Sequence, residues 1–168
     1  RGYRHPLPSA KKLDQYVLLV LSGRRQGLVC SISRMLHFGK VPAELERKIR
    51  AAAQVNAAFI AHTRPGASLG ELLCVGQAAY AEAGFPGEWQ QHHQGGVTGY
   101  EPREYIATAG GADLIAAGQA LAWNPTVAGA KMEDTLLVGE TANEILTFTS
   151  LWPVEQIQFP GLPPVPCA

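Results

Sequence analysis

The stretch HHQGGVTGYEPRE, residues 92–104, brings two histidines, three glycines, one arginine and two glutamates into 13 consecutive positions. A purely structural strand seldom has this composition. A second stretch, WNPTVAGAKMEDT at residues 123–135, joins the end of an apolar segment to a glycine turn and then to Glu133 and Asp134. We therefore expect functional side chains in both stretches.

Strands are expected on both sides of these stretches. An apolar run at residues 16–21 and a second segment at residues 27–34 predict two antiparallel strands. The proline-rich segment from Phe159 cannot supply a regular ladder of N–H donors, so we expect it to lie extended on the surface. Further short strands are expected at residues 89–93, 104–108, 119–123, 134–138 and 144–147.

Two helices are expected between the first strands and residue 84. Residues 42–62 place apolar side chains at helical intervals opposite charged ones, which predicts an amphipathic helix with a proline near its first turn. Ser68 and Glu71 have the spacing of a capping box. A second helix is therefore expected from that box to about Ala83, where Gly84 ends it.

Together with the opening Tyr-Arg-His-Pro, the two stretches resemble the pita-bread superfamily of prolidase, aminopeptidase P, methionine aminopeptidase and creatinase. The resemblance runs in consistent order from about Tyr3 to Thr147. It implies an α+β fold over residues 1–150, a curved antiparallel sheet covered by helices, followed by a proline-rich extended tail at residues 151–168. Such domains begin with a pair of helices before the strand that starts here near Tyr16. We therefore expect the fold to be incomplete at the amino end and the chain to be the carboxyl-terminal portion of a longer protein.

The resemblance also assigns the metal ligands. Superfamily peptidases hold two divalent ions with two aspartates, a histidine and two glutamates. The match at Gly27 and at Ser33-Arg34 aligns the first strand pair, and the match at residues 95–99 aligns the glycine-rich strand. Of the five ligand positions only Glu133 keeps its side chain. The four that have changed are Val20, Ser31, Gly96 and Asn124.

Two further positions match superfamily residues that act on the substrate. Arg103 stands where the peptidases keep a second, substrate-contacting histidine, and His5 lies about where they keep another catalytic histidine. A guanidinium group suits a carboxylate-bearing ligand better than it suits proton transfer. We therefore expect Arg103 to contribute to ligand binding.

One carboxylate cannot hold a dinuclear metal centre, so we expect no metal cofactor and no metal-activated hydroxide. We predict a catalytically degenerate Xaa-Pro-peptidase-like domain that binds a small peptide-like or carboxylate ligand, or a partner, in the former active site. The candidate pocket residues are His5, His92, His93, Arg103, Glu104, Asn124 and Glu133.

Alternative interpretations stay open. The main one is an active aminopeptidase or prolidase-type hydrolase with Mn, Co or Zn on an unusual ligand set of His92, His93, Glu104 and Glu133. Another is a purely structural dimerisation domain. A further alternative is metal-free amidine hydrolysis, as in creatinase. The resemblance implies that creatinase uses a histidine for this reaction at a position that here is Gly96 or Arg103.

The same residues also have structural interpretations. Glu133 and Asp134 are either retained pocket carboxylates or a turn pair before a strand. Arg103 and Glu104 form either a pocket-facing salt bridge or a cross-strand pair, and one histidine of the 92–93 pair is expected to bind a backbone carbonyl.

The composition excludes some classes of partner and favours one cellular compartment. The 168 residues contain 14 Lys+Arg and 14 Asp+Glu, with no basic run longer than a pair, so neither nucleic acid nor an anionic membrane is an expected partner. Three widely spaced cysteines without a zinc-site spacing favour a reducing compartment, and we expect a cytoplasmic protein. The expected partners are a small peptide-like ligand, a second copy in a homodimer and an amino-terminal domain of the same protein.

Overall fold

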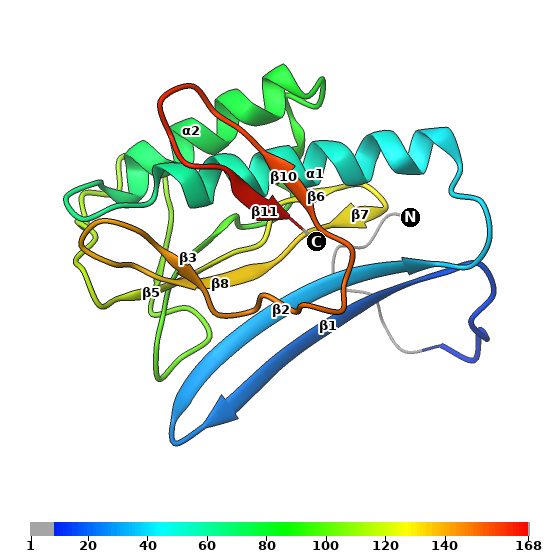
Figure 1. The fold of residues 1–168 in the computed structure, drawn as a ribbon, viewed down its shortest axis with the longest axis horizontal. Helices are drawn as coiled ribbons and strands as arrows, with labels where there is room; N and C mark the ends of the chain where they lie inside the picture. Colours follow the sequence, from blue (N-terminus) through cyan, green and yellow to red (C-terminus); the bar gives the residue numbers. More distant parts are fainter. Residues whose placement is uncertain (1–8, 168) are drawn as a thin grey trace.

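The computed structural model describes residues 9–167, and its centre is a five-stranded antiparallel sheet in the order β4-β3-β5-β8-β9. The helices α1 (Ala43–His62) and α2 (Leu69–Glu82) lie on one side of this sheet, and a long hairpin of β1 (Tyr16–Arg25) and β2 (Leu28–His37) lies on the other (Figure 1). The expected α+β fold, an antiparallel sheet covered by helices, is confirmed.

The other elements are short. The strands of the central sheet are β3 (Gly95–Thr98), β4 (Tyr105–Ile106), β5 (Ala120–Trp123), β8 (Asp134–Leu137) and β9 (Glu144–Ile145). Outside that sheet are the 3-10 helix η1 (Glu88–Gln91) and two strand pairs, β6 (Thr126–Val127) with β7 (Ala130–Lys131) and β10 (Glu155–Ile157) with β11 (Val165–Cys167).

Both helices form where the sequence predicts them. The alanine-rich second half of α1 is buried, and the Phe59 ring stacks on the Trp123 ring with centroids 4.3 Å apart. The capping box of α2 is present, because Ser68 accepts from the Glu71 N–H while the Glu71 carboxylate accepts from the Ser68 N–H. No helix within residues 9–167 is long and apolar enough to cross a membrane.

The hairpin is longer than its sequence pattern predicts. β1 continues through Arg25, and a two-residue turn at Gln26 and Gly27, with φ of 52° and 88°, joins it to β2. Positive φ at both turn positions matches the twist of the two strands. The turn places Val20 opposite Ser33 and Ser22 opposite Ser31.

One local prediction is wrong, and two predicted strands are shorter than expected. Residues 89–93 were expected to form a strand, but Glu88–Gln91 is a 3-10 helix, in which the Gln90 N–H donates to the Gly87 carbonyl. The strands expected at 104–108 and 144–147 begin close to the predicted places but contain only two residues each.

The sequence predicts that the proline-rich segment lies on the surface, but part of it is buried. It turns back on itself, so that β11 pairs with β10 and packs against α1 (Figure 1). Val165 and Cys167 are buried, and the Cys167 thiol lies 3.6 Å from the Ala53 carbonyl. Proline does not prevent a two-stranded pairing, since each strand needs donors on only one edge.

Candidate functional site

Alternation along β8 separates two sets of polar side chains. Asp134 points to the helices, where its Oδ2 accepts a 3.0 Å hydrogen bond from Asn56 of α1. Glu133, the residue before it, points to the hairpin, where Ser33 Oγ donates to its Oε2 at 2.6 Å. Successive side chains of a strand face opposite sides of a sheet. The hairpin-facing side therefore contains the surviving carboxylate of the predicted site.

Glu133 lies between two cationic side chains. Lys131 Nζ donates to Oε2 at 2.7 Å, and Arg103 Nη2 donates to Oε1 at 3.0 Å. The side chains of Glu133, Arg103 and Lys131 are 5%, 11% and 13% exposed, and Ser33 is fully buried. We refer to Ser33, Arg103, Lys131 and Glu133 as the ion cluster. Two cations and one carboxylate give it a formal charge of +1.

The cluster keeps Glu133 ionised. Burial by itself would raise the pKa of this carboxyl, but the charges of Lys131 and Arg103 and the hydrogen bonds from Lys131 and Ser33 outweigh it, so the pKa is lowered. A carboxylate that is ionised near neutral pH and lies between two cations is an acceptor and a counter-ion. It is poorly suited to act as a general acid near neutral pH.

On the helix-facing side, Asp134 belongs to a separate network. Arg34 Nη2 donates to Asp134 Oδ1 at 2.8 Å, and the Thr147 hydroxyl donates to the same oxygen at 2.7 Å. Burial raises the pKa of Asp134 even though Arg34 and these hydrogen bonds oppose the rise. Both carboxylates are thus buried and paired, and a simple turn pair, one of the two interpretations from sequence, is wrong.

The changed ligand positions on the hairpin lie near the cluster but offer it no ligand set. Val20 is 56% exposed and lies opposite Ser33. Ser31 is buried, its hydroxyl lies 2.8 Å from that of Ser22, and its backbone exchanges hydrogen bonds with the Thr135 hydroxyl. An apolar side chain and a hydroxyl used within the fold thus replace two aspartates of the resemblance.

Gly96 cannot be replaced by a ligand without moving the backbone. Its φ of +151° is disfavoured for side-chain-bearing residues, and a Cβ there would collide with the Tyr105 carbonyl oxygen of β4. The close approach of β4 to β3 thus occupies the space where an imidazole would begin.

Asn124 lies across the sheet from Glu133. Trp123 pairs with Asp134, and the Met132 N–H donates to the Pro125 carbonyl, so the ladder continues and places Asn124 opposite Glu133. Trp123 points to the helices, which turns Asn124 to the hairpin side. Asn124 is 3% exposed, and within the described residues its Oδ1 has no hydrogen-bond partner.

The donor set does not fit the two metal ions that the resemblance implies. Glu133 is the one carboxylate among the five matching positions, and both of its oxygens accept from cations. No group of three or more His, Cys, Asp or Glu side chains that could hold a metal occurs in residues 9–167. The alternative set of His92, His93, Glu104 and Glu133 is therefore not assembled among these residues.

The remaining candidates are His92, His93, Glu104 and His5. His92 and His93 follow η1, and their rings stack with centroids 4.4 Å apart. Glu104 is exposed and accepts from the Tyr100 N–H at 2.8 Å. His5 lies outside the described residues. Of the predicted pocket set, Arg103 bonds to Glu133, and the strand register places Asn124 opposite Glu133.

Sequence reasoning missed Ser33 and Lys131. Ser33 was used only to align the first strand pair, and Lys131 was not considered. Lys131 stands two residues before Glu133, and residues two apart in an extended segment share a face. That spacing could have identified Lys131 as a neighbour of the carboxylate.

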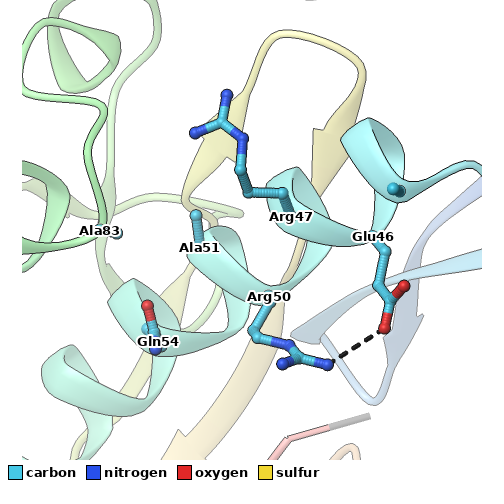
Figure 2. Close-up of a pocket in the computed structure, with 7 residues that line it drawn as sticks. Glu46, Arg47, Arg50, Ala51, Gln54 and Ala83 are labelled. Carbon is cyan, nitrogen blue, oxygen red and sulfur yellow. Dashed lines mark hydrogen bonds and ion pairs between the residues drawn. The ribbon is translucent and has the colours of Figure 1, made fainter.

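Two hollows elsewhere do not extend the cluster. A cavity of about 670 Å³ between β2 and the sheet is mostly apolar, with walls that include Leu28, Val97 and Leu137. A groove of about 320 Å³ lies on the outer face of α1, where Arg50 pairs with Glu46 at 3.1 Å. Figure 2 shows the side chains that line it. Arg47 of that groove lies over the Phe85 ring and pairs with Glu44, so the charges of the groove are already satisfied.

Comparison with known sequences gives one family. The sequence profile of metallopeptidase family M24 matches residues 2–140. An uncharacterized peptidase from Staphylococcus haemolyticus is 28% identical over 151 residues, which are 85% of this chain and 43% of that protein. The chain thus spans less than half the length of this relative.

Solved structures share the fold. Dipeptidase PepE from Mycobacterium ulcerans superposes with a TM-score of 0.79 at 21% identity, over 88% of this chain and 42% of that one. Prolidase from Pyrococcus furiosus superposes with a TM-score of 0.79 at 18% identity, over 89% and 46% of the two chains. The pita-bread fold implied by the sequence resemblance is confirmed, and the match to less than half of each structure is consistent with a partial domain.

Proposed function

Because this chain belongs to metallopeptidase family M24, we propose that it is a member in which an ion cluster has replaced the metal centre and binds a carboxylate ligand. The observation that carries the proposal is the pairing of both Glu133 oxygens with Lys131 and Arg103. These cations stand beside the surviving ligand carboxylate, where the family's peptidases hold metal ions.

The charge of the cluster supports an anionic ligand. Two cations against one carboxylate leave one positive charge uncompensated in a site that is about nine-tenths buried. A buried net charge is costly unless it is paired, and a monoanion would pair it. Arg103 is the better carboxylate partner of the two cations, because its planar guanidinium can bind both carboxylate oxygens.

We propose that this chain does not carry out the metal-dependent hydrolysis that its family name describes. Such hydrolysis requires a metal-activated hydroxide, and one carboxylate already paired with two cations cannot hold the ions that would generate it. In the proposed function, Lys131 and Arg103 bind and orient the ligand carboxylate, while the hydroxyl of Ser33 holds Glu133 in place.

A metal analysis and a binding assay test the two parts together. We expect purified protein to contain no stoichiometric Mn, Co, Zn or Fe and not to cleave Xaa-Pro dipeptides when Mn²⁺ or Co²⁺ is added. We expect butyrate to bind and the neutral, equally sized butyramide not to bind, as measured by calorimetric titration. Stoichiometric metal with dipeptide cleavage, or equal affinity for acid and amide, would overturn the proposal.

A matched pair of variants localises the binding. Arg103→Leu should weaken butyrate binding at least about tenfold, because it removes a charged hydrogen bond. Arg50→Leu removes the same charge from the exposed face of α1 and should leave the affinity unchanged. Equal effects of the two substitutions would show that butyrate senses only the overall charge.

An exposed apolar patch favours a second candidate function, a dimerisation unit. Leu19, Leu21 and Leu28, which strand alternation and register place on one face of the hairpin, are each about half exposed or more. Such a patch is typical of a surface that another chain or domain covers. A homodimer and contact with an amino-terminal domain stay predictions. Light scattering would test the homodimer, which we expect Leu21→Glu to dissociate.

The cytoplasm is the compartment that we propose. All three cysteines, Cys30, Cys74 and Cys167, are free thiols. Free cysteines are typical of reducing compartments. Activity, ligand and partners of the complete protein are likewise proposals, since the chain spans less than half of the relatives that it matches.

A further inference from the structure

Two buried polar atoms beside Glu133 have no hydrogen-bond partner within the described residues. One is the Nε of Arg103, which is a donor, and the other is the Oδ1 of Asn124, which is an acceptor. A buried polar group without a partner is rare in proteins and costly, so each such group needs an explanation.

The two atoms flank the same carboxylate. Arg103 reaches Glu133 with Nη2 at 3.0 Å, which leaves its Nε close by on the same guanidinium plane. Asn124 approaches from the neighbouring strand, directly across the ladder from Glu133. Side chains in such opposed positions have Cβ atoms about 5 Å apart. A donor and an acceptor are therefore both available next to the cluster.

These two atoms select a ligand with complementary groups. A carboxylate oxygen would accept from Arg103 Nε, and a donor on a neighbouring part of the same ligand would serve Asn124 Oδ1. The cluster's charge of +1 decides what kind of donor it is. The ligand carboxylate compensates the charge of the cluster, so an ammonium group on the same ligand would leave one positive charge uncompensated, whereas an amide N–H leaves none.

Resting on the carboxylate binding proposed above, we infer that the ligand is an N-acylated amino acid or the carboxyl end of a peptide. Its carboxylate lies against Arg103 and Lys131, and its amide N–H donates to Asn124. Asn124 is 3% exposed, so the bound amide is enclosed. A ligand that lacks the N–H would leave Asn124 Oδ1 buried without a hydrogen bond, which lowers the affinity by the whole cost of that group.

The inferred contact excludes proline. The nitrogen of an acylated proline carries no hydrogen, so it leaves Asn124 without a donor. Sites built around a hydrogen bond reject ligands that lack the matching group far more strongly than they reject a change in size. The expected ligand therefore ends in a residue other than proline.

Acetylalanine and acetylproline form the decisive pair of probes. Both are monoanions with an acylated nitrogen, and only acetylalanine has an N–H. We expect calorimetric titration of the unmodified protein to give at least about tenfold tighter binding of acetylalanine, the equivalent of one hydrogen bond. Free alanine, with its ammonium group, should bind more weakly than acetylalanine.

Variants assign the difference to Asn124. Asn124→Leu should lower the acetylalanine affinity about tenfold and leave the acetylproline affinity unchanged. Gln54→Leu, on the exposed face of α1, is the control and should change neither. The comparison of the two probes on unmodified protein stands even if Asn124→Leu fails to fold.

The outcomes separate the two proposals. Equal affinity for acetylalanine and acetylproline would overturn the inference about Asn124 while leaving carboxylate binding intact. Absence of binding by butyrate, acetylalanine and acetylproline alike would overturn both. Gly-Gly-Ala distinguishes the two sources of the ligand, because it binds as well as acetylalanine only if the site accepts the end of a longer peptide.

Discussion

At the scale of single residues, Gly96 is a position where the backbone admits no side chain. Its φ of +151° and the Tyr105 carbonyl leave no room for a Cβ. Gly96→Ala should destabilise the protein by about 2 kcal/mol or more, through backbone strain and displacement of β4. Gly87→Ala is the control, because a Cβ there meets nothing. Chemical denaturation of both variants measures the difference, and similar losses would contradict the structure at Gly96.

Glu133 gives a second prediction at this scale, in the pH dependence of stability. Its pKa is lowered in the folded protein from an ordinary value of 4.5, so the unfolded chain takes up the proton first as the pH falls. The stabilisation by ionised Glu133 is therefore complete above about pH 5 and is lost as the pH falls through the folded pKa. Glu133→Gln should cost about 2 kcal/mol at pH 7, and the cost should shrink below pH 4.

Urea denaturation of the two proteins at several pH values measures this difference. Gln54→Leu, which removes no charge, should follow the unmodified protein at every pH. A cost of Glu133→Gln that stays constant from pH 7 to pH 3 would show that the carboxylate is not held ionised by Lys131 and Arg103.

At the scale of elements, α2 depends on its local sequence. The hydrogen bonds between Ser68 and Glu71 in the capping box are exposed to solvent. They therefore stabilise the start of the helix without burying either residue. Ser68→Ala should lower the free energy of unfolding by about 1 kcal/mol, as the loss of an N-cap does elsewhere. Ser68→Asp should keep most of the stability, and an alanine variant as stable as the aspartate variant in thermal unfolding would contradict the cap.

At the scale of the whole molecule, the pair of Arg34 and Asp134 joins all three layers. Arg34 belongs to the hairpin, Asp134 to the sheet, and Asn56 of α1 donates to the same carboxylate. Removing one partner leaves a buried unpaired charge, so Arg34→Leu and Asp134→Leu should each cost about 3–5 kcal/mol. The double variant should cost less than the sum of the two, because neither charge remains.

A double-mutant cycle by urea denaturation measures that coupling. Arg47 and Glu44 on the outer face of α1 form the control pair, since they are about half exposed. A coupling for the buried pair no larger than for this surface pair would show that the layers are held together by apolar packing alone.

Local sequence was enough to predict the elements with strong patterns. The amphipathic repeat of α1, the capping box of α2 and the apolar run of β1 each determine a structure by short-range geometry. The 3-10 helix at Glu88–Gln91 escaped prediction because four polar and aromatic residues have no clear period. The burial of Val165 and Cys167 escaped it because that burial depends on α1, about a hundred residues earlier in the chain.

The sequence by itself determined the fold, because motif order can be read along the chain, and the resemblance predicts that four of the five matching ligand side chains have changed. Only the tertiary structure decided what replaced them. Ser33, Arg103 and Lys131 come from separate strands and loops and meet Glu133 across the hairpin and the sheet. Such contacts depend on register between distant segments, which a linear pattern does not specify.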